Sequence, residues 1–111
     1  MLEYRWCFNL LDTLVAIGYT GPVVLGLNWY EGMFNPDTCG YIKPTGSIAG
    51  GHAIIANGVG IKDKNIRLHN SWGNDWGING ECFMKWDDLD RLLHEQGEAC
   101  VPLKRQMIEV G

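Results

Sequence analysis

The sequence lacks clusters of basic residues and long apolar runs. Its nine Lys and Arg residues stand against 13 Asp and Glu residues, which gives a formal net charge of -4. Nucleic acids and anionic membranes bind surfaces rich in Lys and Arg, so neither is an expected partner. The longest weakly polar stretch, Leu10–Val24, is interrupted by Asp12 and Pro22 and is too short to span a bilayer.

The chain also lacks a recognisable metal site. Its cysteines and histidines are Cys7, Cys39, Cys82, Cys100, His52, His69 and His94. No two cysteines form a CxxC pair, and the histidines do not have the spacing of a zinc finger. We therefore expect neither a structural metal nor a cofactor.

Length and composition indicate one globular domain, residues 1–111. A chain of 111 residues in which 46% are hydrophobic and 20% are charged has the ordinary composition of a folded protein. A domain of this size buries about two-thirds of the surface that its unfolded chain exposes. No internal repeat, low-complexity segment or linker divides it.

The hydrophobic pattern predicts an α+β fold in which one helix precedes several antiparallel strands. Apolar residues recur at helical spacing within Tyr4–Ile17, and Gly18 follows where a C-terminal cap is expected. Pro22 prevents this helix from continuing. Val23–Tyr30 is apolar and β-prone, which predicts a buried strand. Asn35–Gly50 is rich in Pro, Gly, Asp and Ser and is predicted to be a loop.

Three further strands and a short helix are predicted after this loop. The strands are His52–Gly58, Asn65–Asn70 and Glu81–Trp86. A polar turn at Lys62–Lys64 separates the first two, so His52 and Asn70 would lie at the same end of one hairpin. The helix is Asp87–Glu95, capped by Asp87 or Asp88.

His52 differs from an ordinary histidine in an apolar strand because two glycines precede it. The usual role of such a histidine is that of a packed core residue. Gly50 and Gly51 carry no side chains, so the backbone beside His52 is open to a ligand or a partner chain. Asn70 could hold one imidazole nitrogen and leave the other facing a cleft. The pair is therefore a candidate general base with its orienting amide.

A second unusual stretch, NSWGNDWG, runs from Asn70 to Gly77. Tryptophans interleaved with glycines suit neither a regular strand nor a helix, so the stretch is predicted to be a turn anchored by Trp72 and Trp76. For Trp76 a role as a core aromatic is sufficient. The Trp72 indole, lying over an Asn70–His52 hydrogen bond, would exclude water and strengthen that bond.

Together these motifs resemble the C-terminal half of the papain-like cysteine peptidases. That family carries a GHAV or HAI histidine motif followed by NSWGxxWGxxGY, which Gly51–Ile54 and Asn70–Gly80 match. Gly21–Val24 is similar to the family's GPV strand, so the resemblance covers about Gly21–Trp86. Glu81 stands where the family usually has tyrosine, a departure that concerns local packing only.

The resemblance implies a fold and a role for each residue. The chain would be the antiparallel, β-rich C-terminal half of the papain-like fold, with an N-terminal helix. His52 would be the general base and acid partner of a catalytic thiolate, Asn70 would orient it, and Trp72 would shield their hydrogen bond. Gly50 and Gly51 would line the cleft. The reaction would be hydrolysis of peptide bonds in a peptide or protein substrate, without a metal or cofactor.

The nucleophile of such a peptidase is missing from the sequence. No CGxCW-like motif occurs, nor the upstream glutamine that helps to form the family's oxyanion hole. Cys7 is predicted near a helix N-terminus, where a thiolate is favoured, but it lies only 45 residues before His52. The family separates nucleophile and histidine by about 130 residues or more. Three readings remain open: an excised part of a longer enzyme, a separate nucleophile-bearing chain, or an inactive pseudopeptidase that binds a peptide or partner.

The resemblance also suggests a disulfide. In the family a cysteine followed by glycine, upstream of the histidine, often pairs with a cysteine near the C-terminus. Cys39 and Cys100 occupy comparable places. The alternative is that both thiols stay reduced, and the sequence does not decide between the two.

Overall fold

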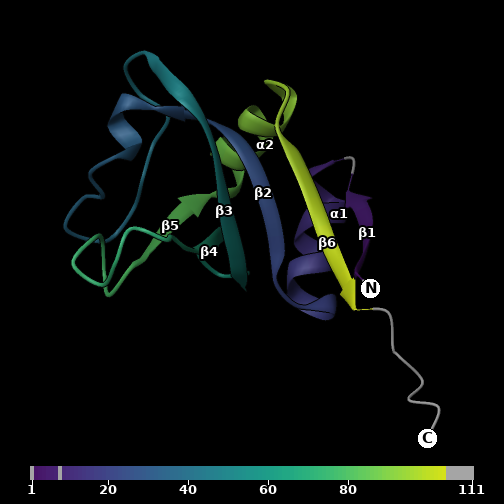
Figure 1. The fold of residues 1–111 in the computed structure, drawn as a ribbon. Helices are drawn as coiled ribbons and strands as arrows, with labels where there is room; N and C mark the ends of the chain where they lie inside the picture. Colours follow the sequence, from purple (N-terminus) through teal and green to yellow (C-terminus); the bar gives the residue numbers. More distant parts are fainter. Residues whose placement is uncertain (1, 8, 105–111) are drawn as a thin grey trace, which may run out of the picture.

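The computed structural model describes residues 2–7 and 9–104 (Figure 1). The elements in chain order are β1 (Leu2–Cys7), α1 (Leu10–Val15), the π-helical turn η1 (Ala16–Thr20), β2 (Val23–Tyr30), the 3-10 turn η2 (Glu31–Met33), β3 (Ile48–Gly60), β4 (Asn65–His69), β5 (Glu81–Lys85), α2 (Trp86–His94) and β6 (Glu98–Lys104). The strands form one six-stranded sheet in the order β1-β6-β2-β3-β4-β5, and each neighbouring pair is antiparallel. The predicted α+β, antiparallel β-rich fold is confirmed.

The helices cover one face of the sheet and enclose the core with it. Alternate residues of β2, from Val23 to Trp29, are buried, as expected of a strand with one face against a core. Helix α2, behind the sheet in Figure 1, adds Leu89 and Leu92 to the same core. Packing of this face therefore fixes strands β2, β3 and β4, which carry the residues of interest.

The N-terminal helix predicted for Tyr4–Ile17 is wrong in its first half. Residues Leu2–Cys7 form the edge strand β1, which pairs with β6 along its length. The helix begins only after Asn9, whose side chain accepts a hydrogen bond from the Asp12 backbone N–H at 2.7 Å. The partner of β1 lies at the other end of the chain, so local periodicity could not reveal this strand.

The other elements follow the predictions closely. Strand β2 has the predicted bounds, and a turn that includes Lys62–Lys64 joins β3 to β4. Strand β3 is longer than predicted, because it begins at Ile48, inside the predicted loop. The predicted aspartate cap of α2 is wrong, because the helix follows β5 directly: Lys85 is its cap residue, and both candidate aspartates lie in the first turn.

Within the described part of the chain, no helix has the length and hydropathy needed to cross a bilayer. The same residues contain no group of three or more His, Cys, Asp and Glu side chains that could hold a metal ion.

Candidate active site

A hydrogen bond joins His52 and Asn70 across the β3–β4 hairpin. His52 lies on β3, and Asn70 directly follows β4, whose last residue, His69, pairs with Ile55. His52 Nε2 and Asn70 Oδ1 are 3.0 Å apart. Because Asn70 is only 2% exposed, water competes little for this bond. The prediction that the two side chains lie within hydrogen-bond reach is confirmed.

The backbone orients the Asn70 amide. The Ser71 backbone N–H donates to Asn70 Oδ1 at 2.8 Å, which identifies this atom as the acceptor. The bond to His52 therefore requires a proton on Nε2, and the neutral ring keeps its lone pair on Nδ1. A histidine held at one nitrogen and free to accept a proton at the other can act as a general base.

Backbone hydrogen bonds hold the glycine-rich turn after Asn70. The Asn70 N–H donates to the Gly80 carbonyl at 2.9 Å, and the Gly80 N–H donates to the Trp76 carbonyl at 2.8 Å. Gly77 has a φ of 59°, and a Cβ there would collide with the Glu81 carbonyl oxygen. Glycine is therefore the residue that fits this position without a shift of β5.

Trp72 covers the imidazole of His52. The two rings are stacked, with centroids 4.8 Å apart and planes at 29°. Trp72 is 39% exposed, so it shields the His52 ring on a side that faces solvent. Trp76 meets Trp72 edge-on at 5.3 Å, and its Nε1–H donates to the Phe34 carbonyl at 2.7 Å. Trp72 packs on the His52 member of the pair as predicted, and Trp76 packs against the core as expected.

His69, the neighbour of Asn70, points to the opposite face of β4, as strand alternation predicts. Its side chain is half exposed, and its Nδ1 lies 3.6 Å from Glu81 Oε2. The same carboxylate oxygen accepts a hydrogen bond from Asn57 Nδ2 at 3.0 Å and lies 3.9 Å from Arg67 Nε. Glu81, the departure from the resembled motif, thus belongs to a polar surface cluster rather than to the His52 pair.

Gly50 and Gly51 lie in the exposed part of β3, and a Cβ at either glycine would meet nothing within 4 Å. The backbone beside His52 is therefore open, as the absence of side chains at the two glycines predicts. A hollow of about 310 Å³ adjoins it, bordered by Gly51, His52 and Glu98.

Two aromatic residues at the site were missed from the sequence. Trp29 meets the His52 ring at 4.7 Å and 72°, and Phe34 stacks on Trp72 at 5.6 Å and 7°. Alternation along β2 could have predicted that Trp29 is buried, but its contact with His52 depends on the register between β2 and β3. Phe34 follows the short turn η2, where no periodic signal exists.

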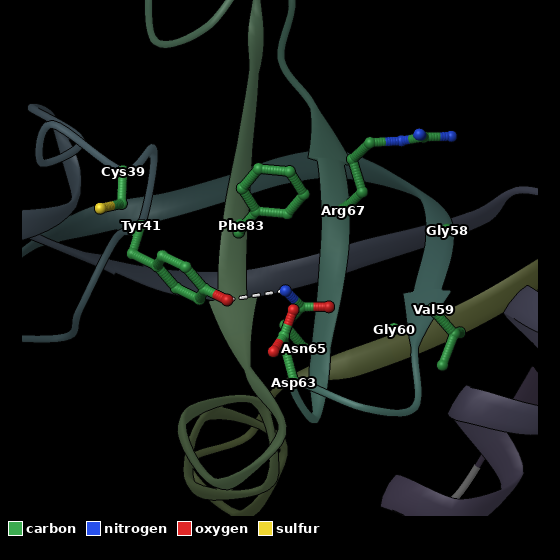
Figure 2. Close-up of a pocket in the computed structure, with 9 residues that line it drawn as sticks. All are labelled: Cys39, Tyr41, Gly58, Val59, Gly60, Asp63, Asn65, Arg67 and Phe83. Carbon is green, nitrogen blue, oxygen red and sulfur yellow. Dashed lines mark hydrogen bonds between the residues drawn. The ribbon is translucent and has the colours of Figure 1, made fainter.

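A second hollow, of about 420 Å³, lies apart from this pair (Figure 2). Tyr41 and Asn65 lie side by side in it, and Asn65 Nδ2 donates to the Tyr41 hydroxyl at 2.7 Å. Arg67 points its guanidinium away from them and donates to Asn57 Oδ1 at 2.9 Å. None of His52, Asn70 and Trp72 lines this hollow, so it is not part of the candidate active site.

Comparisons with known proteins support the fold. The chain is 40% identical over 62 residues to a cathepsin B-like cysteine proteinase of Schistosoma japonicum, across 54% of this chain and 18% of that protein. It is 37% identical over 62 residues to cathepsin B-like cysteine proteinase 6 of Caenorhabditis elegans, across 54% and 16%. Its fold matches xylellain, a cysteine protease from Xylella fastidiosa, with a TM-score of 0.73 and 23% identity over 94% of this chain and 40% of that one.

The chain has the fold of the matching part of papain-like proteases, and part of its sequence is similar to cathepsin B-like cysteine proteinases. It matches a C-terminal region and spans only 18% and 16% of the length of the two curated relatives. No protein-family model matches the sequence.

None of the four cysteines, all within the described residues, is placed to act as the nucleophile of such a protease. Cys7 ends strand β1 and is buried, so the predicted position at a helix N-terminus is wrong. Burial raises the pKa of Cys7 and of Cys100, and it raises the pKa of Cys82 to about 12. A nucleophilic cysteine needs a lowered pKa instead. Cys39 is exposed and lines the second hollow, apart from His52.

The disulfide considered for Cys39 and Cys100 is not formed, because both thiols are free. Cys100 lies on β6 opposite Trp6 and Val24, whereas Cys39 lies near β5, where Tyr41 forms a bridge to Phe83. Strands β2, β3 and β4 separate β6 from β5. At about 4.8 Å per strand this separation far exceeds the about 7 Å between Cα atoms that a disulfide allows.

Proposed function

We propose that this chain provides the histidine and the asparagine of a thiol peptidase active site. The catalytic thiolate comes from a nucleophile-bearing half, either in the same longer protein or in a separate chain. The observation that carries the proposal is the hydrogen bond between His52 Nε2 and Asn70 Oδ1 beneath Trp72. The curated relatives are cysteine proteinases by name, which supports peptides or proteins as the substrate.

The proposed reaction begins when the thiolate attacks the carbonyl carbon of a peptide bond. His52, protonated at Nδ1, donates that proton to the leaving amine as the C–N bond breaks, and an acyl-thioester remains. Water then attacks the thioester while Nδ1 takes a proton from it, and the C–S bond breaks to release the acid and the thiolate. Asn70 keeps Nε2 protonated and the ring oriented, and Trp72 excludes water from their bond.

The hollow beside His52 supports a cleft for an extended chain. Gly50 and Gly51 present backbone without side chains, and open space surrounds both. A peptide backbone can therefore approach β3 closely at this point. In the proposed enzyme these glycines border the cleft on the histidine side.

The test is to supply the missing half. The part of the Schistosoma japonicum proteinase outside the matched region is fused through a flexible linker to Met1, and kcat/KM is measured with a broad set of fluorogenic peptides. We expect turnover by the fusion, blocked by a thiol-directed epoxide, and none by this chain alone. Turnover by this chain alone that disappears in Cys7→Ser would contradict the proposal and identify Cys7 as the nucleophile.

A second candidate function is that of a pseudopeptidase, which holds a peptide or partner in the cleft without cleaving it. The observation that favours it is that burial raises the pKa of Cys7, Cys82 and Cys100, which leaves the chain without an activated thiol among them. A folded fusion that binds the fluorogenic peptides and turns over none of them would favour this function over the first.

A further inference from the structure

We infer that Trp29 is a positioning residue that fixes the orientation of the His52 ring. The inference rests on the proposed function, because only a reacting histidine needs a fixed orientation. The contact itself is independent of it: the Trp29 and His52 ring centroids are 4.7 Å apart, with planes at 72°. No motif in the sequence assigns a role to Trp29.

The register of β2 and β3 places Trp29 beside His52. Trp29 lies opposite Gly50, and Leu27 lies opposite His52. Residues two apart on a strand share a face, so Trp29 and His52 are diagonal neighbours, a spacing that aromatic side chains can bridge. Gly50 has no side chain, so nothing on β3 directly opposite Trp29 competes with the indole for the space near His52.

The rings of His52, Trp29 and Trp72 all contact one another. Trp72 stacks on the imidazole at 29°, whereas Trp29 stands at 72° to the imidazole and at 83° to Trp72. The hydrogen bond to Asn70 holds a third side of the imidazole. A rotation of the His52 ring would therefore break at least one of these three contacts.

Trp29 is the buried residue of this group of three rings. It is 2% exposed, whereas Trp72 is 39% exposed and borders solvent. The Trp29 Nε1–H has no hydrogen-bond acceptor among the described residues. Burial of an unpaired donor is unfavourable. An aliphatic residue would fill the core without burying such a donor. What Trp29 adds at this position is its ring contact with His52 and Trp72.

Nuclear magnetic resonance of the isotope-labelled 111-residue chain tests the inference without any assay of activity. Two properties are measured for His52: the signal of the Nε2–H proton, which is visible only while its hydrogen bond protects it from exchange with water, and the χ1 rotamer from three-bond couplings. We expect a protected Nε2–H and one rotamer in the unaltered chain. Trp29→Leu should lose the protected signal and average the rotamers, and Trp29→Phe should restore both.

Matched variants keep the result interpretable. Trp86→Leu removes a different indole, one that is partly buried and donates to the Asn65 carbonyl rather than contacting His52, and should leave both properties unchanged. Backbone amide spectra report whether each variant is folded, and Trp29→Met replaces Trp29→Leu if the latter does not fold. Unchanged His52 properties in the Trp29 variant, or equal loss in Trp86→Leu, would overturn the inference.

The fusion described above separates this inference from the proposed function. In an active fusion, Trp29→Leu should lower kcat and leave KM nearly unchanged, because Trp29 orients the base and does not hold the substrate. An inactive fusion with the expected resonance results would remove the proposed function and leave the Trp29 contact established. Dependence on His52 without any effect of Trp29→Leu on kcat or on the resonances would remove this inference alone.

Discussion

Asn70 Oδ1 accepts hydrogen bonds from both the Ser71 backbone and the His52 ring, so the backbone determines which imidazole nitrogen carries the proton. The Asn70 side chain is almost fully buried. A buried amide in this position affects both the free energy of unfolding and which nitrogen of His52 carries the proton. Both effects can therefore be measured without a catalytic assay.

Asn70→Ala should lower the free energy of unfolding by about 1–3 kcal/mol. The substitution empties a buried position and removes the acceptor of two partly buried hydrogen bonds, those from His52 and from the Ser71 N–H. His69→Ala, one position away on the exposed face, should change the free energy of unfolding by no more than about 0.5 kcal/mol. Urea unfolding of the two variants checks the difference, and equal losses would contradict the described burial of Asn70.

Cys82 should make stability depend on pH above its ordinary titration range. Burial raises the pKa of this thiol from 9.0 to about 12. Between these values the folded chain keeps a proton that the unfolded chain has released, so stability is complete below about pH 9 and falls as pH rises, by at most about 1.4 kcal/mol per pH unit. Urea unfolding between pH 8 and 10.5 should show a steeper fall for the unaltered chain than for Cys82→Ala, and parallel curves would refute it.

The contact between two side chains on one hairpin was predictable from the sequence. Contacts between strands that lie far apart in the sequence were not. His52 and Asn70 lie at the same end of β3 and β4, so a short turn and strand alternation are enough to bring them together. Trp29 reaches the same site from β2 through a register that packing of the whole sheet determines. For the same reason the sequence could not locate Cys39 relative to Cys100.

At the scale of elements, the turn between β4 and β5 shows how glycine serves the site. Asn70, Trp72 and Trp76 all lie in or beside this turn, and Gly77 has a left-handed backbone conformation within it. The predicted motif therefore specifies a backbone path as well as side chains. The N-terminal segment shows the opposite case, because β1 forms only through its pairing with β6.

Gly77→Ala should disturb the turn, and Gly51→Ala should not. An alanine at residue 77 adds a left-handed strain of about 1–2 kcal/mol and a collision with the Glu81 carbonyl, whereas one at residue 51 meets open space. We expect the tryptophan fluorescence maximum and the free energy of unfolding to change in Gly77→Ala and to stay close to the unaltered values in Gly51→Ala. The reverse order of effects would contradict the described turn.

At the scale of the whole molecule, the sheet is held by packing and hydrogen bonds, without a bridge among its free thiols. A disulfide that closes a loop of this size would stabilise the fold by about 4 kcal/mol. We therefore expect the urea midpoint to be the same with and without a reducing agent. In the folded chain Cys39, which is exposed, should be alkylated without prior reduction. A midpoint that falls on reduction, with Cys39 protected from alkylation, would show that the bridge forms.

We propose that this chain supplies the base of a thiol peptidase and that another half supplies the thiolate. The most direct test compares His52→Ala with His69→Ala in the fusion to the nucleophile-bearing half. His52→Ala should lower kcat at least about 10²-fold because it removes the proton donor and acceptor, whereas His69→Ala should leave kcat unchanged, since His69 faces Glu81 on the opposite side of β4. Equal activity of both variants, or a loss only in His69→Ala, would contradict the account.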